Sequence, residues 1–188
     1  MSETLLVRRV NCDEWRLLKD VRLRALADSP ESFGSSYERE VAIDDAIWMS
    51  RAASGEGTVS TVTWIAARNV EDPFCAMVTV METQATRESM ELVGMWVDPG
   101  ERGIGLADQL VRTAVVHTRT TDHNDLRLWV AEPNIRAQRP YLRHGFPFFG
   151  RSGCASFEPV DPGTADGCDV CCGGIALADH RLNHVNPD

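Results

Sequence analysis

The sequence lacks long apolar runs, and this shortage excludes a membrane-spanning protein. The longest run of its 188 residues, Phe74 to Val78, has five residues, far fewer than the roughly 20 that a transmembrane helix needs. The N-terminal stretch from Met1 to Val10 carries Glu3, Arg8 and Arg9 without an apolar segment, so we expect no secretory signal. We therefore expect a cytoplasmic location, where the six cysteines stay reduced.

Basic residues are also in short supply. The chain has 19 Lys and Arg against 28 Asp and Glu, which gives a net charge of -9. Such a surface repels nucleic-acid phosphates and anionic membranes unless its basic groups gather in one patch. The sequence shows no such patch, so we expect neither nucleic acid nor membrane as a partner.

What the sequence does contain is typical of one soluble globular domain, with 43% apolar and 25% charged residues. A chain of this length buries roughly 70% of its unfolded surface, so its core needs no metal or disulfide. Apolar periodicity and turn residues predict a mixed α/β sheet with an antiparallel meander in its first half. The strands are expected at Leu5–Val10, Val59–Arg68, Phe74–Met81, Glu91–Val97, Leu126–Val130 and Ile175–Ala178, and the helices from a cap at Asn11 to Asp28, Ile43 to Ala53, Ile104 to Thr118 and Asn134 to His144.

The segment from Glu91 to Ala107 is the most informative. A strand leads through Asp98–Glu101 into Arg102–Ala107, where Gly103 and Gly105 lie directly before a helix. Glycines let the backbone approach a ligand closely, and the first N–H groups of a helix have no intrahelical partner. Such a turn binds anions, pyrophosphate among them. The alternative is an ordinary tight connection between a strand and a helix.

Two motifs in this region of the chain resemble those of the GNAT superfamily of acyl-CoA-dependent N-acyltransferases. Arg102, Gly105 and Ala107 match the motif that starts with Arg or Gln and ends with Gly or Ala, and Met95–Pro99 is similar to the strand that precedes it. The second motif lies about 30 residues downstream and is matched by Asn134, Ala137, Tyr141, Gly145 and Phe146. Upstream, Asp28–Gly34 resembles one GNAT subgroup.

The resemblance implies a fold, a cosubstrate and a binding site. The fold would be a mixed, mostly antiparallel twisted sheet flanked by helices, in a domain of residues 1–150, with an irregular Cys- and Gly-rich segment, 151–188, expected to belong to the same domain. The cosubstrate would be acetyl-CoA. Its pantetheine arm would bond the strand backbone, its pyrophosphate would lie in the turn, and Asn134 would contact CoA or cap its helix. The implied binding residues are Met95, Trp96, Val97, Arg102, Gly103, Ile104, Gly105, Leu106, Ala107 and Asn134.

The implied reaction is attack by a neutral amine on the acetyl thioester, which needs a base, an oxyanion donor and an acid. Tyr141 matches the family's usual acid, although it could instead pack its helix onto the sheet, and Pro140 could kink that helix. For the base we favour Glu91, with Glu132 second; the alternative for Glu91 is an exposed glutamate at a strand end. The sequence therefore predicts catalysis by Tyr141 and Glu91.

The sequence also bears on the acceptor, the oligomeric state and an alternative function. The acceptor is a primary amine, of a small molecule or of a protein, and acidic groups at Glu38, Glu40, Asp44 and Asp45 would suit a cationic one. A homodimer is possible. An alternative function is a non-catalytic acyl-CoA sensor or structural module of the same fold.

The C-terminal pattern of Cys168, Cys171, Cys172, His180 and His184 resembles zinc-ligand spacing. The gap between Cys171 and His180 is short for a zinc finger, so we expect free thiols and no metal.

Overall fold

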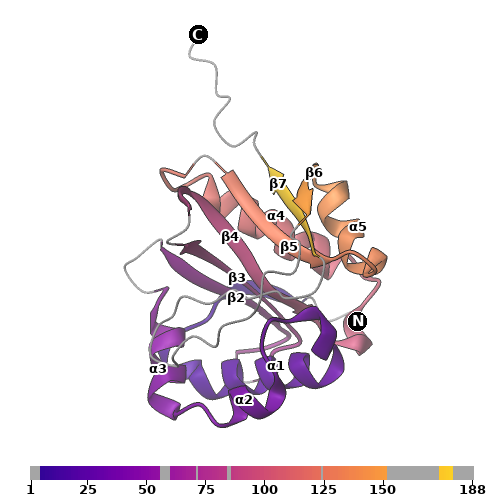
Figure 1. Ribbon diagram of the computed structural model, residues 1–188. Helices are drawn as coiled ribbons and strands as arrows, with labels where there is room; N and C mark the ends of the chain where they lie inside the picture. The colour runs from indigo at the N-terminus through magenta and orange to yellow at the C-terminus, as the bar shows by residue number, and fades with distance from the viewer. Residues whose placement is uncertain are drawn as a thin grey trace.

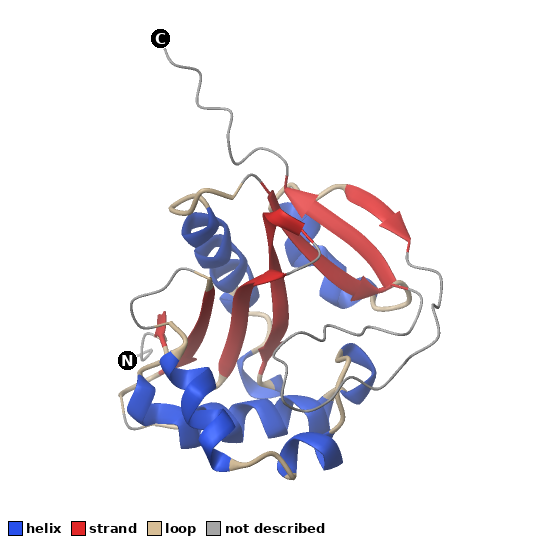
Figure 2. Cartoon of the chain, turned by 60° about the vertical axis from the view of Figure 1, so that its left-hand side comes forward, coloured by secondary structure: helices blue, strands red, loops and turns tan. Residues whose placement is uncertain are grey.

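The computed structural model describes residues 5–55, 60–70, 72–83, 86–123, 125–151 and 174–179. Within them, seven strands form one sheet in the order β1-β2-β3-β4-β5-β7-β6 (Figures 1 and 2). The strands are β1 (Leu6–Arg9), β2 (Thr61–Ala67), β3 (Ala76–Thr83), β4 (Thr86–Val97), β5 (Asp125–Ala131), β6 (Phe148–Arg151) and β7 (Gly174–Asp179). The helices are α1 (Trp15–Asp28), α2 (Tyr37–Val41), α3 (Asp45–Ala53), α4 (Leu106–Thr118) and α5 (Ile135–Arg143), with 3-10 turns η1 (Cys12–Glu14), η2 (Pro30–Ser32) and η3 (Pro99–Glu101).

The sheet is antiparallel except at one place. The neighbours β1–β2, β2–β3, β3–β4, β5–β7 and β6–β7 run antiparallel, whereas β4 and β5 run parallel. A parallel pair needs a crossover connection, and here α4 supplies it between β4 and β5. The predicted mixed, mostly antiparallel sheet with flanking helices is confirmed.

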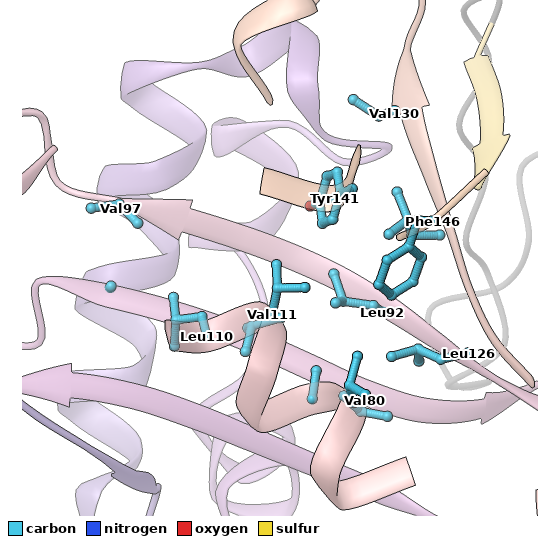
Figure 3. Packing of buried hydrophobic residues seen from close by; sticks show 14 of the residues in the cluster. Val80, Leu92, Val97, Leu110, Val111, Leu126, Val130, Tyr141 and Phe146 are labelled. Carbon is cyan, nitrogen blue, oxygen red and sulfur yellow. The ribbon is translucent and has the colours of Figure 1, made fainter. Parts of the chain in front are cut away.

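Helices pack on both faces of the sheet, because the strands carry apolar side chains on both sides. On one face, α4 and α5 bury residues of the central strands, such as Leu92 and Leu126, against Leu110, Val111 and Phe146 (Figure 3). On the other face, α1 and α3 bury a second cluster. Its members include Val21, Trp48, Ile65, Phe74, Met77 and Trp96. The sheet is therefore the middle layer of three.

The elements predicted from the sequence are all present, and α1 ends at Asp28 as expected before Ser29-Pro30. Three features were missed. The sequence predicted no element where α2 and β6 form, and it placed the start of β4 at Glu91 rather than at Thr86. These pieces are short or polar, and β6 is held by pairing with β7. Among the described helices, none is long and apolar enough to cross a membrane.

Candidate active site

The two central parallel strands separate near the middle of the sheet. Only Ser89–Leu92 of β4 pairs with Asp125–Leu128 of β5. Past these residues, β4 continues to Val97 beside β3, while β5 continues to Ala131 beside β7. Figure 3 shows the strand that carries Leu92 and Val97 diverging from the strand that carries Leu126 and Val130. We call the gap between them the notch; in the described chain, no strand pairs with the side of β4 that faces it.

A bulge in β4 lies next to the apex of the notch. Val93 pairs with Thr79 of β3 and Trp96 with Met77, so β4 holds one residue more than β3 over this interval. The extra residue is accommodated at Gly94, whose φ is 64°. A β-bulge bends its strand, and a positive φ favours glycine. The sequence thus bends β4 at the point where it leaves β5.

The turn after β4 is built by two glycines. Gly103 and Gly105 have φ of 89° and 87°, and Gly105 is the N-cap of α4. Within the described chain, a Cβ at either position would meet no heavy atom within 4 Å, and the N–H groups of Gly103, Ile104 and Gly105 donate to no backbone acceptor. The first N–H groups of α4 also lack intrahelical acceptors. The turn therefore presents backbone N–H donors that have no backbone acceptor in the described chain.

The side chain of Arg102 points back into the protein. Its Nε donates to the Val97 carbonyl at 2.8 Å, and its Nη2 donates to the carboxylate of Asp28 at the end of α1. Asp28 also accepts from Trp96 Nε1 at 2.9 Å. Partial burial acts to raise the pKa of Asp28, but hydrogen bonds from Trp96, Ser29 and Arg102 hold it below its usual value. We call Asp28, Trp96 and Arg102 the Asp28 clamp, which ties the glycine turn to α1 and β4.

Sequence reasoning missed the clamp. The sequence indicated Asp28 only as the end of a predicted helix and as the first residue of the segment that resembles one GNAT subgroup. A second contact from α1 supports the same region, since Arg24 Nη1 donates to Asp98 at 3.0 Å. The pairing of residues about 70 positions apart in sequence leaves no local pattern, so only the fold reveals it.

Tyr141 lies beside the notch on the α4/α5 face, as Figure 3 shows. Its side chain is 6% exposed, and its hydroxyl donates to Met95 Sδ on β4 at 3.6 Å. Burial raises the pKa of this phenol above its usual range, so the group keeps its proton at neutral pH. Helix α5 runs through Pro140 from Ile135 to Arg143. Pro140 therefore does not end the helix before the tyrosine.

Glu91 lies on the opposite face of β4. Its neighbour Leu92 belongs to the α4/α5 cluster, and side chains alternate along a strand. Its Oε2 is buried without a hydrogen-bond partner among the described residues. Burial raises the pKa of Glu91 above 4.5, although the charge of Arg127, its partner on β5, acts to lower it. The candidate acid and base thus lie on opposite faces of the sheet.

The remaining predicted residues surround the end of β5. Asn134 caps α5, because its Oδ1 accepts from Ala137 N at 3.0 Å, and its Nδ2 donates to Ser32 Oγ of η2 at 3.2 Å. Glu132 follows β5 and is half-buried, with its carbonyl accepting from Gln138 Nε2 at 2.8 Å. Glu132 therefore lies past the end of β5, whereas Glu91 lies within the paired part of β4 and β5.

The acidic residues of the second predicted helix region do not form a free anionic patch. Glu40 is 3% exposed and accepts from Arg22 at 2.7 Å and Arg51 at 3.2 Å. Asp45 accepts from Lys19 at 2.8 Å, and Asp44 caps α3 through Ala46 N at 2.7 Å. Glu40 is therefore not available to a cationic acceptor, whereas Asp44 and Asp45 are exposed carboxylates with one described partner each.

The Cys/His pattern of the tail lies outside the described residues. This holds for Cys168, Cys171, Cys172, His180 and His184. In the portion of the chain that the structure describes, no group of three or more His, Cys, Asp and Glu side chains is placed to hold a metal ion.

A split parallel strand pair followed by a glycine turn and a helix is the arrangement that the resemblance implied for an acyl-CoA-binding acyltransferase. The model of the Acetyltransferase (GNAT) family matches residues 23–146. The chain belongs to the GNAT acetyltransferase family, and so it is an acetyl-CoA-dependent N-acetyltransferase.

Solved structures share this fold at low sequence identity. A GNAT-family acetyltransferase from Streptococcus pneumoniae superposes with a TM-score of 0.75 at 13% identity, over 94% of this chain and 98% of that one. A putative acetyltransferase from Salmonella typhimurium with acetyl-CoA gives 0.71 at 11% identity, over 98% of both chains. Spermidine N-acetyltransferase from Vibrio cholerae, with CoA and spermine, gives 0.65 at 14% identity, over 99% and 100%. No curated protein sequence matches the chain.

Proposed function

We propose that this enzyme acetylates a primary amine with acetyl-CoA bound across the notch, with Glu91 as base and Tyr141 as acid. The pantetheine arm lies along Met95–Val97, whose backbone groups on the β5 side have no strand partner in the described chain. The pyrophosphate accepts hydrogen bonds from the turn at Gly103–Ala107, where N–H donors and the helix dipole converge. Asn134 caps α5 beside the cofactor.

The reaction needs two proton transfers. Glu91, directly or through a water, takes the proton that the amine nitrogen loses, and the nitrogen forms its bond to the thioester carbonyl carbon. The tetrahedral intermediate then collapses and breaks the carbon–sulfur bond. The departing thiolate takes its proton from the Tyr141 hydroxyl. A base with a raised pKa and a phenol that stays protonated suit these roles.

The acceptor and the location belong to this proposal. The similar structures include a spermidine N-acetyltransferase and an acetyltransferase of the ribosomal protein L7/L12, so a small molecule and a protein terminus are both compatible with the fold. We place the reaction in the cytoplasm.

The observation that carries the proposal is the Tyr141 hydroxyl, which reaches Met95 on β4 beside the notch. The test is acetyl-CoA turnover with a panel of amines, measured by thiol release, for the wild type and Tyr141→Phe. We expect the variant to lose about 100-fold in kcat and to keep its CoA dissociation constant.

The matched control is Tyr37→Phe, because Tyr37 is the second of the two tyrosines and lies 41% exposed on α2. It should keep wild-type turnover. Equal rates for Tyr141→Phe and the wild type would remove Tyr141 from the mechanism. CoA binding without thiol release for every amine would favour the acyl-CoA sensor.

A further inference from the structure

Trp129 is an exposed aromatic residue on an interior strand. β5 lies between β4 and β7 in the sheet, yet the Trp129 side chain is 39% exposed. Its neighbours Leu128 and Val130 are 1% and 7% exposed and belong to the α4/α5 cluster. Because side chains alternate along a strand, Trp129 points to the opposite face of the sheet.

That face is also the face of Glu91. Glu91 pairs with Arg127, and Trp129 lies two residues farther along β5, which is about 7 Å along the strand. Trp129 is the first residue of β5 beyond the last pair, Leu92–Leu128. The indole therefore stands at the apex of the notch, on the side where the candidate base lies.

Across the notch, the bulge position of β4 is a glycine, and side chains from α1 and β3 border it. Gly94 is the bulge residue of β4, and a Cβ there would lie 3.6 Å from Arg22 Nη1 and 3.8 Å from Met77 Cε. The other face of the sheet is closed by packed core, since Tyr141 and Phe146 are 6% and 1% exposed. We expect an acceptor that reaches a thioester in the notch to approach on the side of Glu91, where the Trp129 indole is 39% exposed.

The charges near this approach do not suit a polycation. Glu40, the buried carboxylate of α2, is shared between Arg22 and Arg51. Arg22 also lies over the Phe33 ring at 4.7 Å, and Arg127 lies beside Glu91. Because Glu40 and Asp125 are paired with Arg22 and Arg127, these carboxylates are already engaged and offer a second ammonium group little, whereas the exposed indole offers a flat apolar surface.

We infer that Trp129 is a specificity-determining residue of the acceptor site and selects a monoamine that carries an aromatic or branched apolar group. The amino group faces Glu91, and the apolar group packs on the indole. The inference rests on the proposed function, because it assumes that the acetyl thioester lies in the notch.

The test compares phenethylamine, ethanolamine and spermidine as acceptors for the wild type, Trp129→Ala and Trp129→Phe. We expect the highest kcat/KM with phenethylamine. Trp129→Ala should raise the KM for this amine about tenfold or more, and Trp129→Phe should restore much of the loss. The KM for acetyl-CoA and turnover of ethanolamine should not change. Ile135→Ala is the control, because Ile135 is an apolar residue of α5 that is 57% exposed.

Calorimetric binding of phenethylamine to the CoA complex gives a second readout. If no amine is acetylated but Trp129→Ala abolishes this binding, the proposed function fails and the assignment of Trp129 stands. If amines are acetylated but spermidine is preferred, or Trp129→Ala leaves the KM for phenethylamine unchanged, the assignment of Trp129 is overturned and the proposed function stands. Absence of both turnover and phenethylamine binding overturns both.

Discussion

At the scale of single residues, the burial of Glu91 predicts how kcat/KM depends on pH. Its carboxyl is buried with Oε2 unpartnered among the described residues, and burial raises its pKa above 4.5. A base must be ionised to act, so kcat/KM should rise with pH through this raised pKa. Glu91→Gln should lose roughly 100-fold in turnover. In this variant, the rise of kcat/KM with pH that is due to Glu91 should disappear, while the rise that is due to deprotonation of the amine substrate remains. The measurement is kcat/KM against pH.

Glu132→Gln is the matched control for that experiment. Glu132 follows β5 and was the second candidate for the base. If the acid limb disappears in Glu132→Gln and survives in Glu91→Gln, the two residues exchange roles. A profile that is the same in both variants and the wild type would mean that neither is the base.

Asp28 is a positioning residue rather than a catalytic one. Its carboxylate receives hydrogen bonds from Trp96 and Arg102, which fix the glycine turn relative to β4. Asp28→Asn should raise the KM for acetyl-CoA about tenfold, because small displacements of a binding group are costly, and it should leave the acceptor KM unchanged. Asp20→Asn is the control, since Asp20 lies on the same helix and pairs only with Arg24 among the described contacts. An unchanged KM for acetyl-CoA would contradict the role of the clamp.

At the scale of elements, our proposal assigns CoA binding to the turn before α4. Gly105 has φ of 87°, and its Cβ position is free of described protein atoms, so a side chain there strains the backbone and enters the space left for the ligand. Gly105→Val should weaken CoA binding at least tenfold in a calorimetric titration. The control is Ile104→Val, because Ile104 is 64% exposed and the substitution keeps its backbone N–H. Equal affinities of the two variants would exclude the turn as the binding site.

Helix α5 shows how an element can tolerate a residue that disfavours it. Pro140 lacks the N–H that would bond the carbonyl of Arg136, yet α5 continues to Arg143. Beyond the proline, His144 N donates to the Pro140 carbonyl at 3.1 Å, and Tyr141 packs edge-to-face on Phe146 at 6.1 Å. Tertiary packing therefore holds the helix, which the local sequence alone could not establish.

At the scale of the whole molecule, Glu40 joins three helices. It lies on α2 and binds Arg22 of α1 and Arg51 of α3. Burial acts to raise its pKa, but the two arginines hold it below 4.5. A carboxyl group whose pKa is lower in the folded state than in the unfolded state stabilises the fold at pH values above its unfolded-state pKa. This stabilisation is lost as the pH falls through the folded-state pKa.

Glu40→Gln should therefore lower the free energy of unfolding by about 3 kcal/mol at neutral pH, because it leaves Arg22, whose side chain is only 15% exposed, without its charged partner. It should also make stability less dependent on pH between about pH 6 and about pH 3. Urea unfolding of the variant, the wild type and Glu31→Gln, an exposed control on η2, measures both effects. A loss no larger than that of Glu31→Gln would show that the Glu40 ion pairs do not hold the helices together.

Local sequence patterns establish the elements, the order of the meander and the glycine turn, because periodicity, caps and turn residues act within a few positions along the chain. They also point to Tyr141 through the motif that contains it, and to Glu91 through its place at the start of the strand that leads to the glycine turn. The folded chain was needed to reveal that β4 and β5 separate beyond Leu92, that Asp28 binds Arg102 and that Glu40 is neutralised by two arginines. Each of these depends on residues distant in sequence, whose pairing is set by the burial of the sheet faces and leaves no local pattern.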